Sequence, residues 1–221
     1  MALPAMPYDI FSLGGVEKSW RTNVMTTGYA LGNINATGAL GNVGFTIWPM
    51  TAGETLNKVQ FNISSALANS GVELNLAIYD LTFRNGGGPG QFSSGIVPND
   101  KVKDLGSIAA DVTGIKTIDI STSPYVMPNN ADYGAIAIAF TLNDPLDSGS
   151  QPAVSSWANA IWNGNSVVPQ GTTAYRNFGP YFSNLLDGTN NYALPSNLSD
   201  PTYKVESNTS QPIWMFIQTE I

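Results

Sequence analysis

Two pairs of closely spaced aspartates have the residue type and spacing that could catalyse hydrolysis: Asp144 with Asp147, and Asp100 with Asp104. Glycoside hydrolases hold two such carboxylates on either side of the bond that they cleave. Aspartates in polar segments are by default solvated loop residues, however. Asp144 and Asp147 also offer oxygen ligands for calcium, but their segment does not have the ligand spacing of an EF-hand loop. We therefore interpret both pairs as loop acids.

A glycine-rich stretch, NGGGPGQF at residues 85–92, is the second candidate for chemistry. Such a loop binds phosphate when a lysine and a helix follow it, or when it joins a strand to a helix in a dinucleotide-binding fold. Neither a lysine nor a helical pattern follows this stretch. Glycine and proline satisfy turn geometry directly. The sequence therefore predicts a hairpin or an Ω-loop here.

Two residue types that dominate enzyme sites are missing, because the sequence contains no histidine and no cysteine. The chain has no imidazole for acid–base catalysis near neutral pH, no thiolate nucleophile and no disulfide. Its net charge is −7, and its nine lysines and arginines are scattered rather than clustered. A nucleic-acid binder needs clustered positive charge to displace counterions. We expect no catalytic residue, no cofactor, no metal and no nucleic-acid partner.

The segment 141–211 is rich in Asn, Ser, Gly and Pro, yet it also holds many aromatic residues. A structureless loop of this length is unusual in a compact domain, so we expect irregular strands folded over one face or edge of the protein. Aromatic rings stack on sugar rings in glycan-binding proteins, and they also fill hydrophobic cores. Trp157, Trp162 and Tyr181 are the candidates for glycan contact, because Asn, Gly, Ser or Pro flanks each of them. Core packing explains most of the aromatic residues equally well.

The first 20 residues differ from the rest of the chain. They contain two prolines and a Gly-Gly pair, with the apolar residues Ile10, Phe11, Leu13 and Trp20 among them. We expect an extended N-terminal arm that anchors the protein on another chain; the alternative is an arm that lies across its own domain. The first 15 residues have no basic region and no long apolar stretch, so they do not resemble a standard secretory signal.

Strands are the elements that must position all of these residues. Pro, Gly or Asn interrupts almost every window that is long enough for a helix. Short segments rich in β-branched and aromatic residues recur instead, and turn residues follow many of them. The predicted strands are residues 24–31, 43–48, 56–63, 72–83, 102–109, 114–120, 133–140 and 213–219.

Two of these strands predict how the sheets are layered. In YGAIAIAF, at residues 133–140, the side chains on both faces of a strand would be apolar. This pattern predicts a central strand covered on both faces. In GIKTIDI, at residues 114–120, the residue types alternate, which predicts one solvent-exposed and one buried face. We predict that Ile78 and Ile138 are buried. The fold class is all-β: an antiparallel, jelly-roll-like β-sandwich at residues 21–221, with an up-and-down barrel as the alternative.

An ordered series of pieces runs through the middle of the chain: VGFTIWPM, ETLNKVQFNISS, VELNLAIYD, GGGPGQ, DLGSIAADVTGIKTIDIS and DYGAIAIAF. The series resembles a β-sandwich module of tailed-bacteriophage virion proteins, especially tail fibres and surface appendages. It covers roughly residues 43–140. The strongest matches are Ile78-Tyr79, Pro89-Gly90, Leu105-Gly106, Gly114 to Lys116, and Tyr133.

The chain also departs from the module in three places. The module's usual arginine before NLAIYD is absent, SSGIVPNDKV is inserted after the glycine run, and Gly134 stands where an aromatic residue often follows Tyr133. Under the resemblance, the Gly/Pro run connects two sheets and is not a catalytic loop.

The resemblance implies a non-enzymatic structural protein on the surface of a tailed-phage virion, made in the host cytoplasm. It implies a tail-fibre or host-adhesion appendage, as a homotrimer, whose partners are baseplate or tail proteins and a host surface glycan. The alternative is a capsid decoration (cement) protein on the major capsid protein, which the short chain favours. A glycan depolymerase is a third reading, opposed by the missing histidine and the missing repeat. No apolar run reaches the ~20 residues of a membrane helix, so we expect no membrane insertion.

Overall fold

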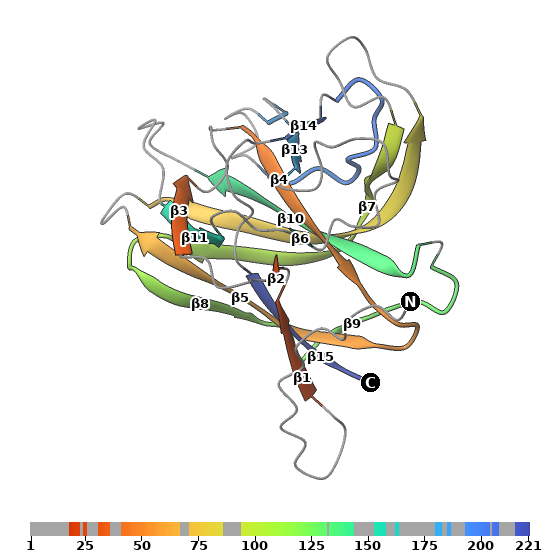
Figure 1. The fold of residues 1–221 in the computed structure, drawn as a ribbon, viewed down its shortest axis with the longest axis horizontal. Coiled ribbons are helices and arrows are strands. Elements are labelled where there is room, and N and C mark those ends of the chain that lie inside the picture. The colour runs from red at the N-terminus through yellow and green to blue at the C-terminus, as the bar shows by residue number, and fades with distance from the viewer. Residues whose placement is uncertain are drawn as a thin grey trace.

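The described part of the chain is all-β. The computed structural model describes residues 18–22, 24–25, 31–35, 41–66, 71–85, 94–131, 133–143, 153–157, 162–163, 180–182, 185–186, 193–203, 205–207 and 215–221. These residues form strands, turns and extended segments, without a helix among them. The strands pair antiparallel in two packed sheets, which confirms the predicted β-sandwich (Figure 1). The jelly-roll strand order and the N-terminal arm stay predictions.

The strands are β1 (Lys18–Thr22), β2 (Val24–Met25), β3 (Leu31–Asn35), β4 (Val43–Pro49), β5 (Thr55–Ser65), β6 (Glu73–Asn85), β7 (Ser94–Ala109), β8 (Gly114–Asp119), β9 (Tyr125–Val126), β10 (Ala135–Asn143), β11 (Ala153–Trp157), β12 (Trp162–Asn163), β13 (Pro180–Phe182), β14 (Val205–Ser207) and β15 (Met215–Glu220). Within the described residues, β14-β13-β4-β10-β6-β7 form a six-stranded sheet. A second, seven-stranded sheet has the order β1-β15-β5-β11-β3, with β8 and β9 also paired to β5.

Strand β5 is the centre of the seven-stranded sheet. Its residues 55–61 pair with β15, and its residues 58–63 pair with β8, so β15 and β8 lie on opposite edges of β5. Strand β1 continues the sheet beyond β15. Strands β2 and β12 form a separate two-stranded ribbon. The first and the last described strands of the chain, β1 and β15, therefore lie side by side in the seven-stranded sheet.

The main hydrophobic core lies between the two sheets. Side chains from β5 and β15 of one sheet pack there against side chains from β4, β6 and β10 of the other. Ile78 of β6 and Ile138 of β10 are directly opposite each other across their pairing, and both are 0% exposed. The prediction that these two residues are buried is confirmed. Burying a side chain of this size stabilises the fold by roughly 1.5–3 kcal/mol.

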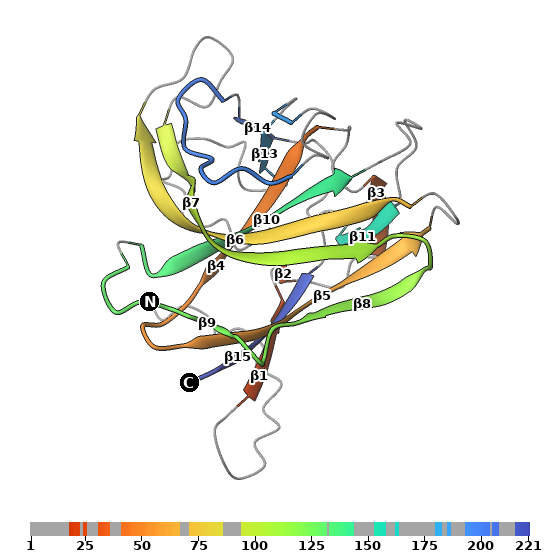
Figure 2. The same ribbon diagram turned by 180° about the vertical axis from the view of Figure 1, so that it is seen from behind.

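A second core covers the opposite face of the six-stranded sheet. Alternate residues of β4, β6 and β10, such as Phe45, Tyr79 and Ala137, point into it. Leu194 and Leu198, from the extended residues 193–203, close this core from outside. Figures 1 and 2 show this segment, in blue, lying on the side of the six-stranded sheet that faces away from β5 and β8. The described end of the loop-rich region therefore covers a sheet face.

The central position of β10 is confirmed by this arrangement. Residues 135–142 are all buried, because β4 and β6 flank the strand in the sheet and a core lies against each face. The alternating pattern of β8 is confirmed as well. Ile118 points into the main core, whereas Ile115, of the opposite parity, is 73% exposed.

The glycine run lies between two neighbouring strands of one sheet. Strands β6 and β7 are paired antiparallel as far as Asn85 and Ser94, and residues 86–93 between them lie outside the described residues. The flanking strands pair as the strands of a hairpin do, while the choice between a hairpin turn and an Ω-loop stays a prediction; the expectation that the run connects two sheets is wrong. The chain passes from one sheet to the other after β7, at residues 110–113. Residues 94–102 of the predicted insertion SSGIVPNDKV are also part of β7, where Pro98 lies opposite Leu81.

Other element boundaries differ from the predicted ones. The predicted strand at residues 24–31 is two strands, β2 and β3, which pair with different partners. Six short or edge strands lie outside the eight predicted strand ranges: β1, β9, β11, β12, β13 and β14. Gly134 has a positive φ of 55°, and its carbonyl accepts a hydrogen bond from Met50 N at 3.0 Å. Glycine adopts this backbone conformation without steric cost, which accounts for the missing aromatic residue at this position.

A close contact joins β4 and β10. Gly44 lies directly opposite Phe140, and the phenyl ring covers the position that a Cβ at residue 44 would occupy. The glycine therefore leaves room for a large aromatic side chain across the strand pair. Glycine within a strand often marks such a close approach.

We expect Gly44→Ala to lower the free energy of unfolding by about 1–3 kcal/mol, because the new methyl group overlaps the ring of Phe140. The double variant Gly44→Ala/Phe140→Leu should lose less than the sum of the two single variants, since leucine leaves space for the methyl group. Urea denaturation of the four proteins measures both effects. Equal stability of Gly44→Ala and the parent, or simple additivity, would contradict the overlap.

Candidate functional site

The three predicted glycan-contact residues lie in three different sheets. Trp157 is in β11 of the seven-stranded sheet, Trp162 is in the two-stranded ribbon, and Tyr181 is in β13 of the six-stranded sheet. Only their backbone positions are described. The pairing therefore does not bring these residues together on one sheet face, and their contact with a glycan stays a prediction.

The predicted anchoring arm, residues 1–20, overlaps the first strand of the sandwich, β1. Ile10, Phe11 and Leu13 lie outside the described residues, so their role stays a prediction. Trp20, in contrast, is part of strand β1 and lies opposite Gln218 of β15. The last residues of the 1–20 segment are thus an edge strand of the seven-stranded sheet. The residues around Trp20 do not reveal a partner strand near the C-terminus, so the sequence pattern alone assigns Trp20 to the arm.

The described aspartates of these pairs make hydrogen bonds to other residues of the fold. Asp104 Oδ1 accepts a hydrogen bond from Gly106 N at 2.8 Å, and Asp100 Oδ1 accepts one from Asn197 Nδ2 at 2.7 Å. Asp144 and Asp147 lie outside the described residues. Within the described part of the chain, no three His, Cys, Asp or Glu side chains gather into a group that could hold a metal ion.

Residues 193–203, here called the covering segment, are held on β6 and β7 by long side chains. A tyrosine, an arginine and a lysine of this hairpin each donate a hydrogen bond to a backbone carbonyl of the segment. An irregular segment has no neighbouring strand to satisfy all its carbonyls, so such donors replace the missing sheet bonds. The bonds are Tyr79 Oη to Pro195 O at 2.5 Å, Arg84 Nη2 to Pro201 O at 2.6 Å and Lys101 Nζ to Leu194 O at 2.9 Å.

Backbone and amide bonds add to this attachment. Lys101 N donates to Ser196 O at 2.7 Å, and Leu198 N donates to Asn99 O at 2.8 Å, so the segment briefly pairs with the edge of β7. Ser199 Oγ donates to Asn99 Oδ1 at 2.7 Å. These contacts fix the position of the segment, and we assign them to stability.

Burial raises the pKa of Tyr79 above the ordinary range of tyrosine, and the negative charge of Asp104 raises it further. The neutral phenol is the form that donates to Pro195 O. An unfolded tyrosine ionises near pH ~10, before the folded one does. Tyr79 therefore contributes stability below that pH, and the contribution is lost as the pH rises toward the folded pKa.

We expect Tyr79→Phe to lower the free energy of unfolding at pH 7 by about 0.5–1.5 kcal/mol, because the bond to Pro195 O is lost. Between pH ~10 and ~11 the parent should lose stability more steeply than the variant, since only the parent must keep the phenol of Tyr79 protonated. Urea denaturation at stepped pH measures both. Parallel pH profiles for the two proteins would show that Tyr79 does not have the shifted pKa.

The outward face of the seven-stranded sheet presents a second group of side chains, here called the outer sheet face. In β15, residues 215, 217 and 219 are buried, whereas residues 216, 218 and 220 are half-buried and point the other way. Directly paired residues of antiparallel strands point to the same side, so their partners share this face. The outer sheet face comprises Lys18, Trp20, Lys58, Gln60, Asn62, Ile115, Thr117, Asp119, Phe216, Gln218 and Glu220.

The strand registers arrange these side chains in rows across the sheet. One row runs Asp119, Lys58, Gln218 and Trp20, from β8 through β5 and β15 to β1. A neighbouring row runs Thr117, Gln60 and Phe216. Gln60 Nε2 donates to Thr117 Oγ1 at 2.9 Å within that row.

The charged groups of the outer sheet face are paired with each other. Lys58 Nζ lies 2.9 Å from Asp119 Oδ2, and Lys18 Nζ lies 3.7 Å from Glu220 Oε2. Asn57 Nδ2 also donates to Glu220 Oε2 at 3.2 Å. Hydrogen bonds from the hydroxyl and backbone N–H of Ser121, helped by Lys58, hold the pKa of Asp119 below its usual range. Asp119 is therefore ionised at neutral pH.

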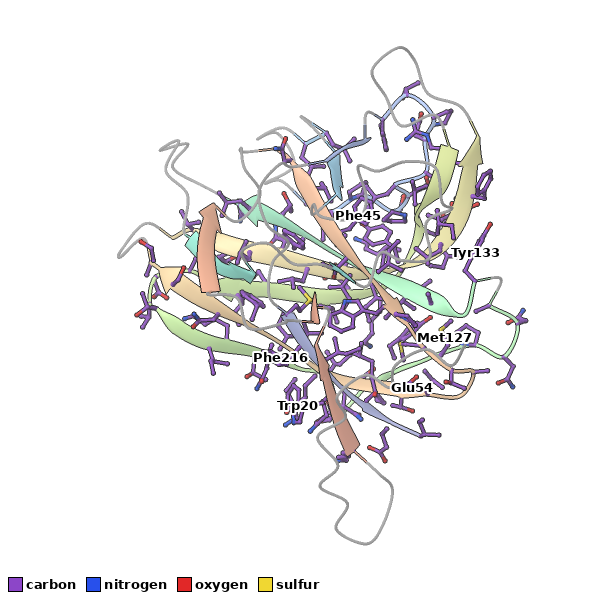
Figure 3. All side chains as sticks on the ribbon, in the orientation of Figure 1. Trp20, Phe45, Glu54, Met127, Tyr133 and Phe216 are labelled. Atoms are coloured by element: carbon purple, nitrogen blue, oxygen red, sulfur yellow. The ribbon has the colours of Figure 1, made fainter. Side chains whose placement is uncertain are left out.

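An aromatic pair lies beside these charges. Trp20 is opposite Gln218, two residues along β15 from Phe216, so the two rings are diagonal neighbours across β1 and β15. Diagonal pairs on a sheet face are within reach of aromatic side chains. Figure 3 shows both side chains at the seven-stranded sheet. The alternation of MFIQTE in β15 could have revealed Phe216 and Gln218, but the pairing that adds Trp20 joins the two ends of the chain.

No protein-family model matches this chain, and no curated protein matches it either. Among the described residues, no helix has the length and apolar character that crossing a membrane requires. The outer sheet face has polar, aromatic and internally paired charged side chains.

Proposed function

We propose that this protein is a non-enzymatic surface protein of a tailed-phage virion, and that it serves as a tail-fibre or host-adhesion appendage. The outer sheet face is the observation that supports an adhesive role. It combines half-buried aromatic residues with amide and hydroxyl groups, and its ion pairs compensate each other. Such a surface suits reversible contact with another molecule rather than bond-making or bond-breaking.

The residues that resemble the phage module have structural roles. Ile78 lies in the main core and Tyr79 in the second core. Gly106 and Gly114 have positive φ angles of 80° and 117°, which glycine tolerates best. These residues favour the sandwich itself, so the resemblance supports the fold, while the exposed face supports the type of contact.

Rigid support for the face also favours adhesion. The strands behind it are anchored by the main core, so the backbone that carries its side chains does not need to be ordered when a partner binds. A homotrimer, which the resemblance implies, presents three copies of the face. Weak contacts of each copy then add to strong attachment of the particle. In this proposal, residues 1–17 connect the sandwich to baseplate or tail proteins.

We expect an antibody against the sandwich to label the tail of intact phage particles, and we expect a variant without residues 1–17 to fold but to be missing from the particle. The truncation keeps β1, because residues 18–22 pair with β15. Immunogold microscopy and cryo-EM locate the label, and thermal melting shows whether the truncated sandwich is intact. Label on the head would support capsid decoration instead, and normal incorporation of the folded truncation would exclude the anchoring role.

A further inference from the structure

We infer that the outer sheet face binds an uncharged glycan chain that crosses the strands and places a sugar ring on Trp20. This inference rests on the proposed adhesive function and names the ligand class of the same face. Three properties of the face support it: its charged groups form ion pairs with each other, it presents amide and hydroxyl groups, and it has a half-buried aromatic pair.

The charge of the face favours an uncharged ligand. Its two lysines and two acids form two ion pairs, Lys58 with Asp119 and Lys18 with Glu220. An anionic ligand would meet two carboxylates without an unpaired cation to bind it, and the whole protein repels it with a net charge of −7. A cationic ligand would have to compete with the lysines that already hold the acids. Neither sign of charge is therefore attracted.

The polar groups between these ion pairs match hydroxyl groups. A sugar hydroxyl both donates and accepts hydrogen bonds, and an amide or a hydroxyl side chain does the same. Gln218 lies between Lys58 and Trp20 in one row, and Gln60 lies between Thr117 and Phe216 in the next. The bond from Gln60 to Thr117 fixes the orientation of that amide, so its oxygen faces a definite direction.

Trp20 supplies the apolar part of the contact. The C–H side of a sugar ring packs on an aromatic face, and Trp offers the largest such area. Because Trp20 stands on a paired strand beside Phe216, its position is fixed by the sheet and not by a loop. The row that ends at Trp20 crosses four strands, which at about 4.8 Å per strand is a length of roughly 14 Å. A row of that length fits a chain of sugars better than a single one.

A second copy of this protein fits the face less well. The centre of a protein–protein interface is depleted of charged residues and enriched in large apolar ones. Here, polar and charged side chains separate Ile115 from Phe216 and Trp20. The apolar groups are spaced for contacts with separate rings and do not form one continuous patch.

The test uses the purified full chain and two kinds of probe: neutral polysaccharides built from glucose, galactose, mannose or N-acetylglucosamine, and one anionic polyuronate. Affinity electrophoresis and saturation-transfer NMR detect weak binding to each. We expect binding to at least one neutral polymer and none to the polyuronate. Trp20→Ala should weaken that binding roughly tenfold, Gln218→Ala should weaken it to a smaller extent, and Trp20→Phe should retain part of it.

Phe83→Ala is the matched control, because Phe83 is a 42% exposed aromatic residue of the six-stranded sheet, away from the outer sheet face. It should bind like the parent, and thermal melting should show that every variant is folded. Should Trp20→Ala misfold, Asp119→Asn gives an independent readout: it releases Lys58 and should allow the polyuronate to bind.

The outcomes separate this inference from the proposed function. Failure of every neutral polymer to bind, or unchanged binding by folded Trp20→Ala, overturns the glycan face but leaves tail labelling untouched. Preference of the parent for the polyuronate also overturns it. Label on the head with glycan binding intact overturns the adhesive appendage, while the measured binding face stands.

Discussion

The middle strands of the six-stranded sheet are apolar on both faces, and the rest of the structure depends on covering them twice. In β10, isoleucines point to one side and alanines to the other, and all of them are buried. One side is closed by the seven-stranded sheet. The other cannot be left in water, because it includes Phe45 and Tyr79. A two-sheet sandwich alone would expose this face, so a third layer is required.

The covering segment provides that layer without being a regular sheet. Its leucines supply apolar contact, but its carbonyls also enter a partly buried region, where unpaired polar groups are costly. The long side chains of Tyr79, Arg84 and Lys101 reach these carbonyls from the β6–β7 hairpin. Arg84 is held there at some cost, since its Nε and Nη1 are buried without a hydrogen-bond partner in the described part of the chain. Irregular structure on a sheet face thus needs long polar side chains from the sheet beneath it.

The sequence allowed the strands with strong local patterns to be predicted, but not their partners. The parity of β8 and the two-sided burial of β10 follow from residues next to each other, as does the burial of Ile78 and Ile138. Glycine and proline indicated a turn after β6, yet composition cannot say whether the next strand joins the same sheet. That depends on pairing of β6 with β7 along their length, which includes Pro98 and three register shifts.

Because local sequence does not reveal strand partners, it did not reveal the candidate site either. Trp157, Trp162 and Tyr181 have similar local sequences, but pairing distributes them over three sheets. The outer sheet face exists only because β1 and β15, from opposite ends of the chain, lie side by side. No local window contains both Trp20 and Phe216, so no periodicity within one window can place them together.

Strand alternation separates stability from recognition in this sheet. In β15, Met215, Ile217 and Thr219 serve the core, while the residues between them form the outer sheet face. Because successive side chains point to opposite sides, an outward residue can change without altering the packing behind it. The position of each outward side chain is nevertheless set by the inward ones, since a shift of one residue in register would exchange the two faces. The core therefore determines where the surface groups stand, and the surface sequence determines only what they contact.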